Sequence, residues 1–403
     1  QFSQSGSTLN RLTQKQIEKI QIPVLPLADQ QAILETRRRL QEFEVTISGL
    51  RNRLYSEPFK LEDVQKTLEL FEGNQKGADE PYQVNDKPQA LTTLSLDQWI
   101  DSLPYPLATI LRTYTADRTP KGKVEHLFSF FEAFGEFMVM VLLSGLNNDS
   151  TYYEQTLRPQ MSKKFTGYHA TWYQRPSFGN WVRVFGFLAK RIRSAINNPQ
   201  EADHMLARFG QPDTHFLEAL TQKELVPLLE KLNLMRNDIK GHGGYMDDET
   251  APKQLQELEE ALARIRELIG PAFQTVQMLR PIPNTMGFSN GRFTCQAERF
   301  HSSSTYFTPE TIETSVPLDH DKLYLWTGEH ADPIELPPLI RLHVEKNQID
   351  CYFYNGSDRK KGSKDVTLVK WVCYHVTNEP NLKIEDPAYL QVLDALLTVQ
   401  PNN

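Results

Sequence analysis

The chain has few cysteines and no long apolar run. Its 403 residues include only Cys295, Cys351 and Cys373, and these show no spacing typical of a metal site. Such a sparse, odd set fits a reducing cytoplasm better than a disulfide framework, so we expect a cytoplasmic protein with core thiols. The longest apolar stretch, 137–143, is too short to cross a bilayer, and no secretion signal opens the chain. We therefore expect no membrane partner and no bound metal.

Several catalytic motifs are also missing. The sequence contains no Asn-Pro-Pro-Tyr or Asp-Pro-Pro-Tyr methyltransferase motif, no Gly-rich cofactor loop and no Walker phosphate loop. Pro212-Asp213 has no acid-x-Lys partner nearby, so a restriction-nuclease core is not predicted. The formal net charge of −7 argues against a non-specific nucleic-acid coat. These absences predict neither methyl transfer nor a bound cofactor.

The sequence does contain the apolar and aromatic residues of folded domains, at 39% and 10%. Helical spacing predicts helices over 123–146, 181–196, 214–233 and 252–269, together a bundle of four or five helices. From Arg292 onward the pattern alternates, which predicts strands near 323–326, 339–344, 351–354 and 366–375. We therefore expect a mainly α multidomain chain with a small antiparallel β (α+β) domain at its C-terminal end.

The first 57 residues contain a proline-punctuated connector and then a helix. The prolines of 22–27 exclude a helix, whereas apolar residues recur every seven positions from Ile33, as in a coiled-coil seam. The polar face of this helix carries Arg37, Arg38, Arg39, Arg51 and Arg53. These arginines either contact phosphate or face water, and runs of helix charges usually face water.

Residues 12–33 resemble the end of a type I restriction-modification specificity subunit, in which an Ile-Pro-x-Pro-Pro-Leu-x-x-Gln turn leads from a target-recognition domain into a spacer helix. Here Leu25 replaces a proline, and Ala28-Asp29 stand where two acids are common. The resemblance implies that DNA and an adenine methyltransferase domain or subunit are partners. It also implies that the base-reading part lies upstream, so we expect this chain to be a fragment. The alternative is a proline-rich lead-in to an unrelated coiled coil.

A second motif contains Arg236, Asn237 and His242 and lies between two predicted amphipathic helices. The order of arginine, polar residue, four residues and histidine resembles the signature of HEPN domains, small helical bundles of prokaryotic defence systems. The resemblance covers about 92–275. It implies an endoribonuclease that acts on RNA without a metal, and a cleft completed by a second copy. A homodimer is therefore expected.

The chemistry of this motif can be argued from its side chains. A histidine with a pKa near neutrality can accept the proton of a ribose 2′-hydroxyl, and Arg236 can hold the scissile phosphate with its planar fork. Asn237 would orient the phosphate or the imidazole. Six residues of helix turn through about 600°, so Gly241, Gly243 and Gly244 must loosen the helix end before His242 meets Arg236. The alternative is that both cations cap a helix C-terminus.

The expected organisation has four parts. These are a specificity-subunit-like tail and coiled-coil helix at 1–57, a linker at 58–91, a HEPN-like bundle at 92–275 and a β-rich domain at 276–403. We expect a defence protein associated with DNA restriction-modification, whose HEPN-like part is either an active ribonuclease or an inactive regulator. The alternative is a non-catalytic region that dimerises or binds DNA for an adenine-N6 methyltransferase or restriction enzyme.

Overall fold

The computed structural model describes residues 95–165, 173–241, 249–303, 307, 309–328, 331–345, 348–359, 367–376 and 381–397. The predicted tail, spacer helix and linker lie outside the described residues, as do Arg37, Arg38, Arg39, Arg51, Arg53 and His242. All described residues belong to the unit 91–403.

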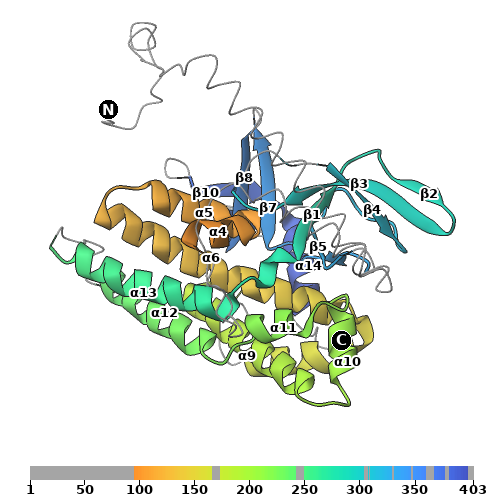
Figure 1. Ribbon diagram of the computed structural model, residues 1–403, viewed down its shortest axis with the longest axis horizontal. Helices are drawn as coiled ribbons and strands as arrows, with labels where there is room; N and C mark the ends of the chain where they lie inside the picture. Colours follow the sequence, from red (N-terminus) through yellow and green to blue (C-terminus); the bar gives the residue numbers. More distant parts are fainter. Residues whose placement is uncertain are drawn as a thin grey trace, which may run out of the picture. The chain divides into compact units, whose positions relative to one another are not determined.

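The first part of this unit is helical (Figure 1). Its helices are α4 (Leu96–Ser102), α5 (Tyr105–Ala116), α6 (Pro120–Asn147), α7 (Ser150–Tyr152), α8 (Arg158–Phe165), α9 (Phe178–Ile196), α10 (Ala202–Arg208), α11 (Thr214–Leu220), α12 (Leu225–Gly241) and α13 (Ala251–Ile269). A π-helical turn at Tyr153–Leu157 joins α7 to α8. Local signals start several of them: Ser95 and Gln98 form a capping box at α4, and the Thr119 side chain caps α6 just before Pro120.

Helix α6 is central to the helical layer. It contacts α5, α9, α12 and α13, and its aromatic side chains, such as Phe130, Phe134 and Phe137, are fully buried. By length and composition alone α6 could cross a membrane, but 89% of its apolar window is buried inside the fold. Near its end, Gly145 lets the Phe209 ring approach closely, because a Cβ there would lie 2.2 Å from the ring. Helix α6 is packed as a core helix.

The C-terminal part forms two antiparallel sheets beside the helical layer (Figure 1). The larger sheet has the order β2-β3-β1-β5-β6, with β4 also paired to β3. Its strands are β1 (Gln277–Pro281), β2 (Gly287–Ser289), β3 (Arg292–Phe300), β4 (Pro309–Thr314), β5 (Tyr324–Trp326) and β6 (Ile334–Glu335). The smaller sheet has the order β10-β9-β8-β7. It contains β7 (Ile340–Glu345), β8 (Gln348–Arg359), β9 (Thr367–Val372) and β10 (Asn381–Glu385), and α14 (Pro387–Leu397) follows it.

The expectation of a mainly helical α+β chain with antiparallel strands towards its C-terminal end is confirmed. Helices α6, α9 and α13 lie where the apolar spacing predicts them. The single helix predicted over 214–233 is wrong, because two helices, α11 and α12, occupy that region. Proline has no amide hydrogen and clashes with the preceding turn, so Pro227 fits only in the first turn of a new helix.

The helices and the smaller sheet share one buried core. This core joins the aromatic residues of α6 to Cys351, Trp371 and Cys373, while a second cluster around Cys295 lies in the larger sheet. The three cysteines are buried and unbridged, which confirms the expectation of core thiols.

Helix α14 binds back onto elements far away in the sequence. The hydroxyl of Tyr153 donates a hydrogen bond to the carbonyl of Leu396, and the hydroxyl of Tyr173 donates one to Asp394. Helix α14 also packs against α8 and β9. The end of the described chain is thus part of the same packed unit as the helical layer.

A candidate functional site between helix α6 and the small sheet

Arg236 lies on α12 and forms a forked ion pair with Glu132 on α6. Its Nη1 donates to Oε1 of Glu132 at 3.2 Å, and its Nη2 donates to Oε2. Both side chains are largely shielded from water. A forked pair of charge-assisted hydrogen bonds is stronger than a neutral one and fixes the plane of the guanidinium. Arg236 is therefore held in one orientation between two helices.

The predicted catalytic residues are only partly placed. Asn237 follows Arg236 on α12 and is exposed, whereas His242 lies outside the described residues. Helix α12 continues through Gly241. Any loosening that turns His242 towards Arg236 must therefore begin at or beyond Gly241.

One turn along α6 from Glu132, a second carboxyl group is completely buried. Neither oxygen of Glu136 has a hydrogen-bond partner among the described residues. Burial raises the pKa of Glu136 well above its usual range, and the neighbouring Glu132 carboxylate raises it further. The backbone of Tyr354 lowers this pKa, but by less than the other two effects raise it. Glu136 is thus held as a neutral acid beside the charged pair.

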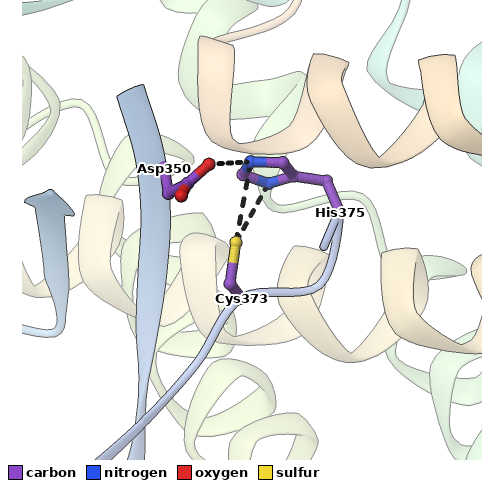
Figure 2. Close-up of side chains that lie close together, drawn as sticks. All are labelled: Asp350, Cys373 and His375. Atoms are coloured by element: carbon purple, nitrogen blue, oxygen red, sulfur yellow. Dashed lines mark hydrogen bonds and ion pairs between the residues drawn. The ribbon is translucent and has the colours of Figure 1, made fainter. Parts of the chain in front are cut away.

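A third group of polar side chains lies in the small sheet. Asp350 is on β8, and Cys373 and His375 lie just beyond the end of β9 (Figure 2). Nε2 of His375 is 3.4 Å from Oδ1 of Asp350. Sγ of Cys373 is 3.4 Å from Nδ1 and 3.6 Å from Nε2 of the same ring. One nitrogen, one sulfur and one oxygen donor thus converge within 4.8 Å.

The end of strand β9 explains this convergence. Strands β8 and β9 pair antiparallel with Phe353 opposite Val372, and the pairing ends there. Cys373 follows directly, and Tyr374 and His375 form a turn. This turn leaves Cys373 and His375 beside Asp350, which lies three residues before Phe353 on β8 (Figure 2).

The electrostatics of this cluster do not suit a cysteine nucleophile. Burial raises the pKa of the Cys373 thiol to about 12. Burial also lowers the pKa of His375, although Asp350 opposes that shift. The reactive form of cysteine is the thiolate, and a fully buried thiol beside a neutral imidazole is a poor nucleophile. The Cys-His-Asp arrangement therefore does not favour acyl transfer.

Tyr374 connects the two regions. It lies between Cys373 and His375 in the sequence, and its ring packs edge-on against Phe353 of β8. Burial, then Glu132 and Glu136, raise the pKa of Tyr374, while Arg236 opposes the shift. Its phenol is thus electrostatically coupled to the groups on α6 and α12. The segment 373–375 is thus linked to both regions, to the cluster by Cys373 and His375 and to the groups on α6 and α12 by the electrostatic coupling of Tyr374.

Sequence reasoning did not identify Glu132, Asp350, Cys373 or His375 as site residues. The expectation of no metal site rested on cysteine spacing alone, whereas the signal present is a Cys-x-His spacing in a region of alternating residues. Asp350 joins them only through the pairing of β8 with β9, whose register shifts at a bulge between Tyr354 and Ser357.

Comparisons with protein-family models, with curated proteins and with solved structures found no match. The function of the site is therefore inferred from the chemistry of its residues.

Proposed function

We propose that residues 92–275 are a HEPN-like domain that cleaves RNA without a metal ion, using Arg236, Asn237 and His242. The forked pair between Arg236 and Glu132 carries the proposal. An arginine that merely capped α12 would donate to the last carbonyl groups of its own helix. Arg236 instead directs both Nη groups to a carboxylate on another helix, which favours a positioned phosphate-binding group over a cap.

Each residue has a distinct role in the proposed reaction. A guanidinium carries five N–H donors, and Glu132 accepts from Nη1 and Nη2, so other donors can serve a non-bridging phosphate oxygen. His242 accepts the 2′-hydroxyl proton as that oxygen attacks phosphorus. The 5′ oxygen then leaves and takes a proton from water, His242 returns its proton to the solvent, and the products are a 2′,3′-cyclic phosphate and a 5′-hydroxyl. Asn237, exposed beside Arg236, orients the phosphate.

The proposal extends to the rest of the chain. Residues 1–57 would supply a DNA-targeting tail and a spacer helix that act with an adenine methyltransferase domain or subunit. The HEPN-like part would then be the RNA-cleaving response of a cytoplasmic, homodimeric defence protein. The alternative is a non-catalytic region that dimerises or binds DNA for an adenine-N6 methyltransferase or restriction enzyme. The exposed Leu234 on α12 favours it, because this apolar side chain can contact a second copy of the chain.

The test is cleavage of an end-labelled RNA pool in EDTA by the full chain. We expect products with 2′,3′-cyclic phosphate ends, and a loss on the order of 100-fold or more in His242→Ala. Arg236→Lys keeps a positive charge opposite Glu132 but loses the fork, so it should also lose most activity. His215→Ala, which removes an exposed histidine of α11, is the matched control and should cleave normally.

Two results would reject the proposal. A folded protein that cleaves no RNA would support the non-catalytic assembly module. Cleavage that survives His242→Ala would remove the assigned base.

A further inference from the structure

We propose that Asp350, Cys373 and His375 bind a divalent transition-metal ion of the zinc class, with water at an open fourth position. This site is separate from the proposed RNA cleavage and does not depend on it. The ion would join β8 to the segment that follows β9, next to Tyr374, whose pKa is raised by burial and then by Glu132 and Glu136 of α6.

The donor set selects the class of ion. One thiolate, one imidazole and one carboxylate are the ligand types that bind zinc in proteins. Calcium and magnesium prefer sets made of oxygen alone, so a buried sulfur and nitrogen argue against them. Thiolate and imidazole together favour zinc or another borderline transition metal.

Two of the three donor separations are also close to those around a shared ion. Zinc bonds of about 2.3 Å to sulfur, 2.05 Å to nitrogen and 2.0 Å to oxygen, at tetrahedral angles, separate sulfur from nitrogen by about 3.6 Å and nitrogen from oxygen by about 3.3 Å. The observed separations from His375 Nε2 are 3.6 Å to Cys373 Sγ and 3.4 Å to Asp350 Oδ1. A direct N–H···O hydrogen bond prefers about 2.7–3.2 Å. The Nε2 to Oδ1 distance is therefore long for a hydrogen bond, and the three donors lie close enough together to share one ion.

Binding requires one local movement. Sγ of Cys373 is nearly equidistant from both nitrogens of His375, so the sulfur faces the ring and not the Nε2 lone pair. A turn of the imidazole about its Cβ–Cγ bond directs that lone pair at the ion. This torsion has broad minima, so the backbone can stay in place.

The fourth position is assigned to water. Cys373 is fully buried, whereas Asp350 and His375 retain some exposure, which leaves solvent access on their side. On the neighbouring strand β7, His343 pairs directly with Asp350. His343 is not assigned as the fourth ligand, because it is exposed and its ring packs towards Tyr352. Three protein ligands with water form an open site, as in catalytic zinc centres.

The test is titration of the untagged full chain, stripped of metals and kept reduced, with Co²⁺ and then with Zn²⁺. We expect one equivalent of Co²⁺, a thiolate-to-cobalt charge-transfer band, intense visible bands of tetrahedral cobalt, and displacement by Zn²⁺. Cys373→Ala should abolish the charge-transfer band. Cys295→Ala, a buried cysteine in the other core cluster, should keep it. Loss of a residue that only supports a metal ligand costs roughly 10- to 100-fold in affinity. Asp350→Asn removes a ligand itself, so it should weaken binding by at least that factor.

The unmodified protein tests the proposal even where a variant fails to fold. X-ray absorption of its zinc form should contain one sulfur and several nitrogen or oxygen neighbours. Absence of sulfur, absence of bound cobalt, or a charge-transfer band that survives Cys373→Ala would overturn the proposal. His343→Ala should bind normally, and loss of binding there would overturn the open fourth position.

Discussion

At the scale of single residues, Glu136 is the most unusual group on α6. Its carboxyl group is buried without a hydrogen-bond partner among the described residues, one turn from a carboxylate that already pairs with Arg236. Burial of an isolated charge costs several kcal/mol, so the group keeps its proton instead. The fold thus contains an acid whose protonation is coupled to stability.

This coupling predicts a pH-dependent effect of Glu136→Gln. Above the usual carboxyl pKa of 4.5 the unfolded chain releases a proton that the folded chain retains, so the free energy of unfolding falls as pH rises towards the raised pKa. Glutamine cannot ionise and removes this loss. Urea unfolding should find the variant more stable by more than about 1 kcal/mol at pH 8, and little changed near pH 4. The exposed Glu257→Gln is the control, and an equal response of both variants would contradict the coupling.

The residues of the site differ in how far the sequence predicts them. Arg236 and Asn237 follow from a local motif, because their importance lies in residue type and spacing. Glu132 is 104 residues away from Arg236, and its role depends on how α6 packs against α12. Asp350 depends on strand register, which a bulge in β8 shifts. Pairings of this kind are set by tertiary packing and have no signature in nearby residues.

At the scale of elements, α6 supports both the core and the candidate site. Glu132 and Glu136 lie one turn apart, and Gly145 lies beneath the Phe209 ring near the end of the helix. Substitutions of similar size along α6 should therefore differ sharply in their effect on the free energy of unfolding.

Two glycine substitutions on α6 make this difference measurable. Gly145→Ala should destabilise the protein by about 1–3 kcal/mol, because its Cβ would lie 2.2 Å from a Phe209 ring carbon. Gly135→Ala meets only ordinary contacts at 3.5 Å, and alanine favours the helix by up to about 1 kcal/mol. Chemical denaturation of the two variants gives the comparison. Equal effects would show that the Phe209 ring does not lie against Gly145.

The elements themselves were mostly predictable. The apolar periodicity of α6, α9 and α13 is strong because each buries one long face. The break between α11 and α12 was missed although Pro227 marks it. Helix α14 was missed as well, although Pro387 follows Asp386, whose side chain accepts from the Tyr389 amide at the helix start. The division of the strands into two sheets follows from long-range pairing, which alternation alone does not encode.

At the scale of the whole molecule, the HEPN resemblance predicts a homodimer. Leu234 is 63% exposed on the same helix as Arg236 and Asn237. We expect light scattering to give the mass of a dimer, and Leu234→Asp to shift it towards a monomer if α12 forms the contact. Phe288→Asp, on the hairpin strand β2 and 65% exposed, is the matched control and should leave the dimer intact. A monomeric unmodified chain would count against both the dimer and the composite cleft.

The attachment of α14 has a consequence for how this protein is made. Tyr153 bonds to a carbonyl that is translated 243 residues later, and Tyr105 bonds to one translated 244 residues later. Ribosomes add about 5–20 residues per second, so these early helices wait roughly ten seconds or more for their partners. During that interval the nascent chain lacks the late strands and α14, which complete the core around these aromatic residues. We therefore expect the helical layer to depend on chaperones until synthesis has passed residue 397.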